Sequence, residues 1–221
     1  MWISEHGKTY GTLEEYEFRR ERWLETQAEI ERVNAQPGNT FTVGHNQFSD
    51  LTHDEMKRMS GYRGGEVDLD VTPTALNASN IPSYVNWVER GACNPIQNQG
   101  SCGSCWAFAS VAEMEAQHFI ATGQLLKLSE QQCVDCDTGS SNCNWGYPSS
   151  CMDHVKNNGG ISLESDYPYV GYTQSCHERY GGPVDVSRVQ AGVRESESQL
   201  LAAIANQPVT VNVRDDSTVW R

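Results

Sequence analysis

The stretch Gln99-Gly100-Ser101-Cys102-Gly103-Ser104-Cys105-Trp106 leads into the largely apolar run 107–112. Glycine and serine favour a turn before the run, which predicts a helix that begins at Cys105 and ends near Thr122, with Gly123 just beyond it. A thiol at the start of a helix lies near unpaired backbone N–H groups, whose partial positive charge favours the thiolate. The thiolate is the nucleophilic form of cysteine, so the stretch indicates a reactive Cys105.

The same stretch is similar to the local signature Cys-Gly-[Ser/Ala]-Cys-[Trp/Tyr] of papain-like cysteine proteases. The resemblance implies that Cys105 is a nucleophile that forms an acyl-enzyme and divides amide hydrolysis into two steps with lower barriers. It also implies that the side-chain amide of Gln99 and the backbone N–H of Cys105 form an oxyanion hole. Without this motif, Cys105 would be taken for a buried structural thiol and Gln99 for a solvated loop residue.

Two Cys-x-x-Cys pairs, Cys102/Cys105 and Cys133/Cys136, allow two other interpretations. A zinc site would need four free thiolates, and the 27 residues between the pairs exceed the usual spacing of 15–20 residues. A thioredoxin-like redox motif would follow a strand in a βαβ unit, and no strand is predicted before Cys102. The papain-like interpretation is therefore favoured, and no metal or cofactor is expected.

Composition restricts the partners and the compartment. The 221 residues carry a formal net charge of −13, which argues against nucleic acid and anionic membrane surfaces as partners. No apolar run is long enough for a transmembrane helix. Eight irregularly spaced cysteines suggest an oxidising compartment with disulfides. The polar start Met1–His6 is no signal peptide, so we expect that the N-terminus is missing from a secreted or lysosomal/vacuolar protein, and that the protein is a monomer.

A long helix is predicted near the N-terminus. Thr12 and Glu15 form a capping box that opens a helix running to about Asn34. Its apolar positions recur as in an ordinary amphipathic helix. Its register, however, resembles the Glu-Arg-Phe-Asn-Ile-Asn helix of the inhibitory propeptide in cathepsin-L-like proteases. The matching positions, with Trp23 in place of Phe and Thr26 in place of Asn, are Glu15, Arg19, Trp23, Thr26, Ile30 and Asn34.

A second propeptide motif follows this helix. The segment 44–50 matches the pattern Gly-x-Asn-x-Phe-x-Asp of the same propeptides at Gly44, Asn46, Phe48 and Asp50. The order of the two motifs ahead of the protease signature implies an inhibitory propeptide. On this basis Glu15 and Arg19, an i,i+4 pair, are expected to hold the propeptide helix to the rest of its module.

The composition of 61–80, rich in glycine and small polar residues, indicates an extended linker. It contains one possible N-glycosylation sequon, Asn77-Ala78-Ser79. The following segment Ile81–Trp87 resembles the mature N-terminus of the papain family, so activating cleavage is expected near Asn80. The predicted domains are a helical inhibitory propeptide domain at 1–60, the linker at 61–80, and the N-terminal part of a papain-like peptidase domain at 81–221.

The resemblance implies an α+β class: a papain-like two-domain fold with a helical domain and a truncated β-rich domain, preceded by the helical propeptide. A short helix is expected to start at Ser129. The segment from Leu200 to Val213 is predicted to form a helix followed by a strand at 208–213. In this family the catalytic histidine and asparagine lie about 130–150 residues beyond the cysteine. Position 235 lies past Arg221, so we expect most of the β-rich domain to be missing and this chain to be inactive as given.

The resemblance also implies disulfide pairs and substrate-binding residues. Cys102 is expected to pair with Cys143, and Cys136 with Cys176. The pairing of the remaining cysteines stays open: Cys133 with Cys151, and Cys93 with a cysteine outside this sequence, are two ideas. The substrate-binding positions implied, with the Gly146 backbone pairing with extended substrate and the next two residues lining an apolar pocket, are Gly103, Gly146, Tyr147 and Pro148. Trp145 stands where the family usually has a glycine.

Two functional hypotheses follow. The first is a cysteine endopeptidase zymogen, kept latent by its own propeptide, activated in an acidic compartment, and acting on peptide and protein substrates after an apolar penultimate residue. The alternative is a non-catalytic truncated homologue that acts as a propeptide-type protease inhibitor.

Overall fold

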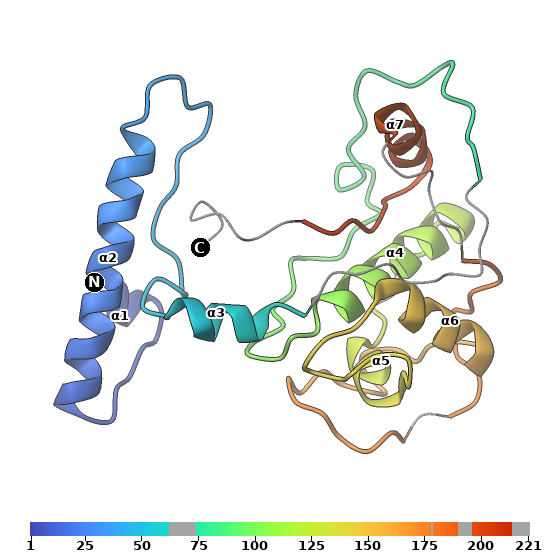
Figure 1. The fold of residues 1–221 in the computed structure, drawn as a ribbon. Coiled ribbons are helices and arrows are strands. Elements are labelled where there is room, and N and C mark those ends of the chain that lie inside the picture. The colour runs from blue at the N-terminus through green and yellow to red at the C-terminus, as the bar shows by residue number, and fades with distance from the viewer. Residues whose placement is uncertain (62–73, 178, 190–195, 214–221) are drawn as a thin grey trace. The chain divides into compact units, whose positions relative to one another are not determined.

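The computed structural model describes residues 1–61, 74–177, 179–189 and 196–213. The described residues contain seven α-helices (Figure 1) and two isolated antiparallel bridges, Leu128 with Leu163 and Ile161 with Val184. They fall into two compact units, one built from Met1–Arg58 together with Val213 and the other from Met59–Asn212. Among these helices, none combines the length and the apolar character needed to cross a membrane.

The first unit is organised by the long helix α2, Leu13–Asn34, with α1, Trp2–Glu5, before it and α3, His53–Met59, after it. The predicted capping box is present in part, because Glu15 binds the N–H of Gly11 and not that of the N-cap residue Thr12. Thr12 Oγ1 accepts a hydrogen bond from the backbone N–H of Glu15 (3.1 Å), and Glu15 Oε2 accepts one from the N–H of Gly11 (3.0 Å). The predicted start and end of this helix are confirmed.

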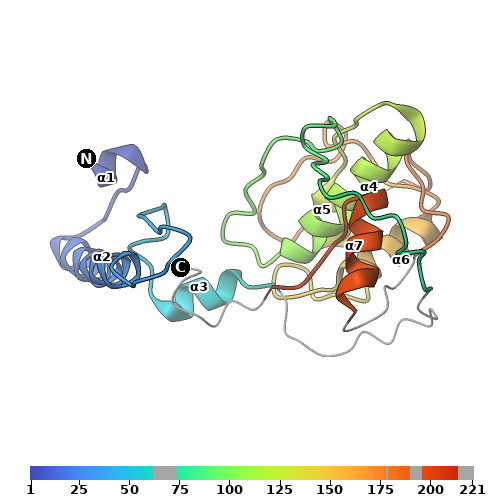
Figure 2. The same ribbon diagram turned by 90° about the horizontal axis from the view of Figure 1, so that it is seen from above.

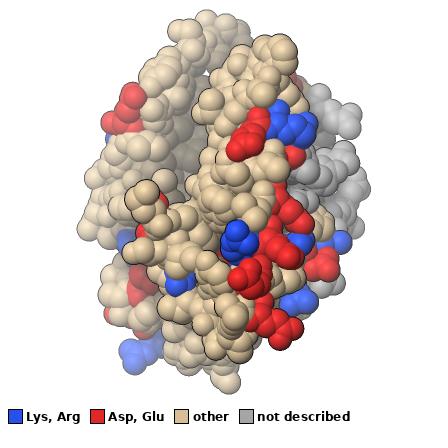
Figure 3. Space-filling model, turned by 90° about the vertical axis from the view of Figure 1, so that its left-hand side faces the viewer, with Lys and Arg blue, Asp and Glu red and all other residues tan. Residues whose placement is uncertain are grey.

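Charges of both signs are interspersed on the surface of α2, although the net charge is strongly negative. Figure 3 shows acidic and basic side chains next to one another on the face that it displays. Three i,i+3 ion pairs lie along the helix: Arg20–Glu17, Arg22–Glu25 and Arg32–Glu29. Such exposed pairs contribute about 0–1 kcal/mol each to stability. They keep the surface of the helix polar but do not determine where the helix packs.

The second unit has a helical core. Helices α4, Cys105–Thr122, α5, Glu130–Cys136, and α6, Pro148–Asn158, pack against one another, and Figures 1 and 2 show them side by side. The buried core between them includes the apolar side chains of Trp106, Val111, Leu128, Val134, Val155 and Ile161. Burial of these apolar side chains is the main favourable term for folding this unit.

The helices expected at Cys105 and Ser129 are both confirmed. Helix α4 ends at Gly123, whose φ of +78° is a left-handed conformation that glycine adopts without strain. The Ser129 hydroxyl accepts a hydrogen bond from the N–H of Gln132 (3.0 Å) and caps α5. Helix α6 was not predicted, although Pro148 at its first turn is a favourable start signal.

The C-terminal prediction is half correct. Helix α7, Glu197–Asn206, starts three residues before the expected Leu200 and is capped by Ser196. The strand expected at 208–213 is wrong, because this segment is paired with no other strand among the described residues. The N–H of Thr210 instead donates to the carboxylate of Glu113 (2.9 Å). Apolar alternation alone does not form a strand when no neighbouring strand accepts its ladder of hydrogen bonds.

Candidate active site

Cys105 is the first residue of α4 and is half-buried. Its thiol is free of any disulfide, as is that of Cys93. The first N–H groups of a helix have no partner within the helix, so the Cys105 thiol lies at the positive end of an 18-residue helix.

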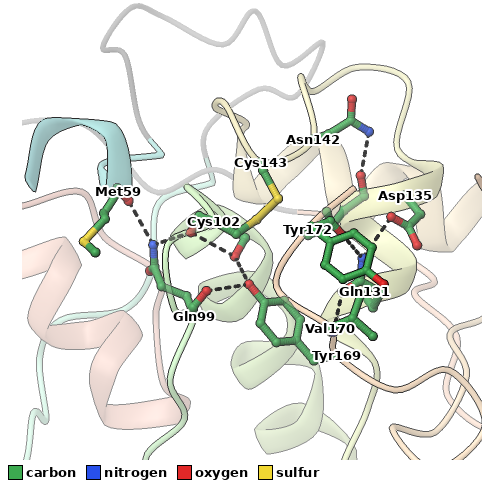
Figure 4. Close-up of a disulfide and its surroundings, with 12 residues drawn as sticks. Met59, Gln99, Cys102, Gln131, Asp135, Asn142, Cys143, Tyr169, Val170 and Tyr172 are labelled. Carbon is green, nitrogen blue, oxygen red and sulfur yellow. Dashed lines mark hydrogen bonds between the residues drawn. A yellow bond between two sulfur atoms is a disulfide. The ribbon is translucent and has the colours of Figure 1, made fainter. Parts of the chain in front are cut away.

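Gln99 lies beside the start of α4 with its amide engaged by two carbonyl groups. Its Nε2 donates to the backbone oxygen of Met59 (2.9 Å) and to that of Cys102 (2.8 Å). Figure 4 shows the Met59 carbonyl directed at this amide. The backbone oxygen of Met59, the last residue of α3, therefore occupies the side-chain donor of Gln99.

Gly61, two residues further on, lies close to Cys105. It is buried, and its carbonyl oxygen accepts a hydrogen bond from the N–H of Gly146 (2.9 Å). A Cβ added at Gly61 would overlap the carbonyl oxygen of Gly103 and lie 3.0 Å from Sγ of Cys105. Only glycine fits here, so the chain around residue 61 passes directly against the thiol.

Tyr169 contacts both Gln99 and Ser104, and no motif of the sequence identified it as a site residue. Its hydroxyl donates to the backbone oxygen of Gln99 (2.8 Å) and lies 2.7 Å from the Ser104 hydroxyl (Figure 4). Its ring packs edge-on against Phe108, with centroids 4.9 Å apart. Burial raises the pKa of Tyr169, which keeps the hydroxyl protonated as a donor. Tyr169 thus ties the Gln99 loop to the residue before Cys105.

The other predicted substrate-binding residues lie around Gly146. A Cβ at Gly146 would overlap the indole of Trp106, so the backbone runs close over the start of α4. Tyr147 is the N-cap residue of α6, and Pro148 is its first residue. Trp145 packs edge-on against Tyr147, with ring centroids 5.6 Å apart. The extra indole therefore adds aromatic surface to the wall beside Gly146.

Three disulfides hold these loops: Cys102–Cys143, Cys133–Cys151 and Cys136–Cys176. The first and third are the pairs implied by the resemblance, and the second is one of the pairings left open. Next to the first, the N–H of Gly103 donates to the carbonyl oxygen of Cys143 (2.8 Å). Since Cys102, Cys133 and Cys136 are oxidised, the two Cys-x-x-Cys pairs do not offer four thiolates to zinc, nor a free dithiol. In the described part of the chain, no cluster of side chains suits a metal ion.

In the first unit, the motif residues of α2 from Arg19 onward contact the segment 43–55, whereas the Glu15 carboxylate accepts its hydrogen bond from Gly11 instead. The Arg19 guanidinium binds both carboxylate oxygens of Glu55 at 2.7 Å and also donates to the backbone oxygen of Asp50 (3.2 Å). Asp50 is buried and accepts hydrogen bonds from Lys8 (2.8 Å) and the Tyr10 hydroxyl (2.9 Å). Burial, followed by the bond to Asp50, raises the pKa of Tyr10 to about 12.

The remaining motif residues make further contacts to the same segment. Trp23 stacks on His45 with ring centroids 4.1 Å apart. Asn34 exchanges two hydrogen bonds with the backbone of Val43 (2.8 and 2.9 Å), and the Thr26 hydroxyl donates to the backbone oxygen of Ser49 (2.9 Å). Asn46 Oδ1 accepts from the N–H of Phe48 (2.8 Å). Residues that line a cavity of about 180 Å³ in this unit include Ile30, Gly44 and Phe48.

The Arg19–Glu55 pair should stabilise the first unit measurably. The side chains are only 17% and 30% exposed, so Arg19→Ala should cost about 1.5–3 kcal/mol, the range for hydrogen bonds to charged groups. Arg32→Ala is the matched control: Arg32 also makes two bonds to one carboxylate, Glu29, but is 56% exposed, and its loss should be nearly neutral. Hydrogen-exchange protection of residues 13–34 measures both effects within this unit.

The same pair predicts a pH dependence. The hydrogen bond from Arg19, aided by Thr52, lowers the pKa of Glu55 from 4.5 to about 2. A carboxyl group whose pKa is lowered by folding stabilises the folded state fully above its unfolded pKa, and this contribution disappears as the pH falls through the folded pKa. Stability from the pair should therefore be constant above about pH 5 and decline towards pH 2. Equal protection and equal pH profiles for wild type and Arg19→Ala would contradict this role.

Comparisons with known proteins cover both units. The model of the papain family cysteine protease matches residues 81–220, and that of the cathepsin propeptide inhibitor domain (I29) matches residues 1–56. A senescence-specific cysteine protease of Arabidopsis thaliana, SAG12, is 37% identical over 96% of this chain, and caricain of Carica papaya is 38% identical over 96%. The chain spans 65% and 62% of the lengths of these two relatives. The structure of a recombinant stem bromelain precursor is similar with a TM-score of 0.84 and 30% identity, over 93% of this chain and 68% of that one.

Proposed function

The chain belongs to the papain family of cysteine proteases, and from this premise we propose that it acts as a cysteine endopeptidase zymogen kept latent by its propeptide. The resemblance inferred from the sequence is confirmed, and so are the α+β papain-like fold and the presence of a cathepsin-type propeptide inhibitor domain. The proposed boundaries are 1–60 for the propeptide domain, 61–80 for the linker and 81–221 for the peptidase part.

The single observation that carries the latency is the position of Met59–Gly61 against the thiol. The carbonyl of Met59 accepts from Gln99, and that of Gly61 accepts from Gly146. In our proposal these two donors hold the substrate in the active enzyme: Gln99 Nε2, with the N–H of Cys105, stabilises the oxyanion, and Gly146 pairs with the substrate backbone. A propeptide that occupies both donors excludes a substrate from them.

The chemistry proposed for Cys105 is nucleophilic. The thiolate attacks the scissile carbonyl carbon, the carbonyl oxygen becomes negatively charged between the Gln99 amide and the Cys105 N–H, and the amine leaves with a proton to give an acyl-enzyme. Loss of one such oxyanion donor typically costs about 2.7–4 kcal/mol. Tyr169 supports this geometry, because it binds both the Gln99 backbone and Ser104.

The proposed reaction also needs a proton donor for the leaving amine, which in this family is a histidine about 130–150 residues beyond the cysteine. Two of the histidines that follow Cys105 have other places in the structure. His118 is 13 residues further along α4, about 20 Å away at 1.5 Å per residue, and His177 stacks on Tyr167. We therefore propose that the polypeptide 1–221 by itself is inactive, since general acid catalysis contributes about 10²–10⁴-fold.

Substrates, compartment and oligomeric state follow from the same premise as proposals. The substrates are peptides and proteins, with an apolar pocket beside Tyr147 and Pro148, and no nucleic acid or membrane is involved. Three disulfides are consistent with secretion or with a lysosomal or vacuolar location. Activation requires cleavage near Asn80, and the protein acts as a monomer. Nothing in the two units or in the comparisons supports the alternative of a non-catalytic inhibitor.

Inhibition in trans tests the role of the propeptide. The segment 1–79 should slow the hydrolysis of a peptide substrate by caricain, because it carries both the α2 motifs and Met59–Gly61. Arg32→Ala in the segment should inhibit equally well, and Arg19→Ala should inhibit less at temperatures where its weaker fold begins to open. A folded segment 1–79 that leaves caricain activity unchanged would contradict the proposed latency.

A further inference from the structure

The linker before the peptidase part presents one asparagine in an unusual local arrangement. Asn77 and Ser79 are both exposed. Asn77 Oδ1 accepts two hydrogen bonds from Ser79, one from its backbone N–H (3.0 Å) and one from its hydroxyl (2.6 Å). Nδ2 of Asn77 donates to no described atom. The side chain is therefore held by its oxygen and offers its nitrogen to solvent.

The neighbouring backbone is fixed, so this arrangement has a defined place on the second unit. Gln199 of α7 donates from Nε2 to the carbonyl oxygen of Leu76 (3.0 Å) and accepts from the N–H of Leu76 (2.6 Å). This pair of bonds holds residue 76 against α7 in the way that a strand partner would. Asn77 then projects from a supported segment, and a bulky group on its Nδ2 displaces no packed side chain.

The sequence around Asn77 is the acceptor pattern for N-linked glycans, and the disulfides supply the compartment. Asn77-Ala78-Ser79 is the only Asn-x-Ser/Thr triplet in the 221 residues. Three disulfides imply folding in an oxidising compartment of the secretory route, where such triplets are modified. Two independent features, local geometry and redox state, thus point to the same modification.

We propose that Asn77 is an N-glycosylation site. The modifying reaction joins Nδ2 of Asn77 to the anomeric carbon of an oligosaccharide donated by a lipid pyrophosphate carrier. The bond between that carbon and the phosphate oxygen breaks, the lipid pyrophosphate leaves, and Nδ2 gives up one proton to the transferase. Asn77 lies four residues before Ile81, so the glycan belongs to the propeptide side of the proposed cleavage. The glycan is therefore lost on activation, a consequence that rests on the proposed function.

The test is secretion of the full chain from cultured eukaryotic cells behind a cleavable signal sequence, with medium and cell lysate examined together. Peptide N-glycanase should increase the gel mobility of the wild type and convert Asn77 to Asp in the peptide map. Asn77→Gln and Ser79→Ala should abolish the shift completely, whereas Ser79→Thr should retain it. Asn80→Gln is the matched control: Asn80 is exposed in the same segment but lacks a hydroxyl two residues later, so its shift should equal that of the wild type.

These readouts do not depend on peptidase activity, so they separate this proposal from the function proposed above. An unshifted wild type, in cells that glycosylate a co-expressed secreted protein, overturns the site. A shift that persists in Asn77→Gln overturns it as well. All the substituted side chains are exposed, so the variants should fold as the wild type does.

Discussion

Replacing both Cys102 and Cys143 by serine is expected to lower the free energy of unfolding by about 4 kcal/mol, since the disulfide closes a loop of 41 residues and restricts the unfolded chain. The replacement should also disturb the candidate active site, because the backbone oxygen of Cys102 accepts the hydrogen bond from Gln99, and the N–H of Gly103 donates to the backbone oxygen of Cys143. Hydrogen-exchange protection of residues 105–122, followed as a function of urea concentration, measures the effect within the second unit.

Cys93→Ser is the control for this experiment. Cys93 is a half-buried free thiol, so its replacement removes a sulfur atom without opening a loop. Its cost should be that of an ordinary substitution, about 1 kcal/mol. If the double variant is as stable as Cys93→Ser, the disulfide does not hold the unit as described.

Gly61→Val is expected to expose the Cys105 thiol. The new side chain would overlap the Gly103 carbonyl, and strain of about 1–3 kcal/mol from overpacking would shift the segment away from the site. Because 1.4 kcal/mol corresponds to a factor of ten in a population, alkylation of Cys105 by iodoacetamide should become about 5- to 100-fold faster. Peptide mapping of the full chain gives this rate.

Two references make the alkylation experiment specific. Cys93 lies in the same chain, and burial, followed by the charge of Glu115, raises its pKa, so it should react slowly and at the same rate in both proteins. Lys57→Ala changes an exposed residue of α3 and should leave the Cys105 rate unchanged. A Cys105 rate that is equal in Gly61→Val and wild type would show that residue 61 does not cover the thiol.

Local signals made the helices predictable from the sequence. Thr12, Ser129 and Gly123 act through caps within a few residues, and these caps were found as expected. The start of α4, and with it the position of Cys105, followed from the same kind of signal. Helix α6 was overlooked because its few apolar residues form no long periodic run.

Contacts between distant residues were not predictable in the same way. Tyr169 meets Gln99 and Ser104 across 70 and 65 residues, and no local pattern encodes such a pairing. Glu55, the partner of Arg19, lies 36 residues away outside both propeptide motifs. The cysteine count allowed several partners for Cys133. Cys151 is the partner in the structure because α5, which carries Cys133, packs against α6, which carries Cys151. The strand expected at 208–213 failed for the same reason, since a strand depends on its neighbour.

Hydrolysis by a completed chain tests most directly whether Cys105 is the nucleophile of a cysteine endopeptidase. In the chimera, this chain is continued by the C-terminal third of caricain, and residues 1–80 are removed before the assay. The chimera should hydrolyse a dipeptide amide with an apolar penultimate residue. Cys105→Ala should reduce this hydrolysis to background, and residues 81–221 without the caricain part should also show only background hydrolysis. Hydrolysis that survives Cys105→Ala, or a folded chimera that hydrolyses nothing, would contradict the assignment.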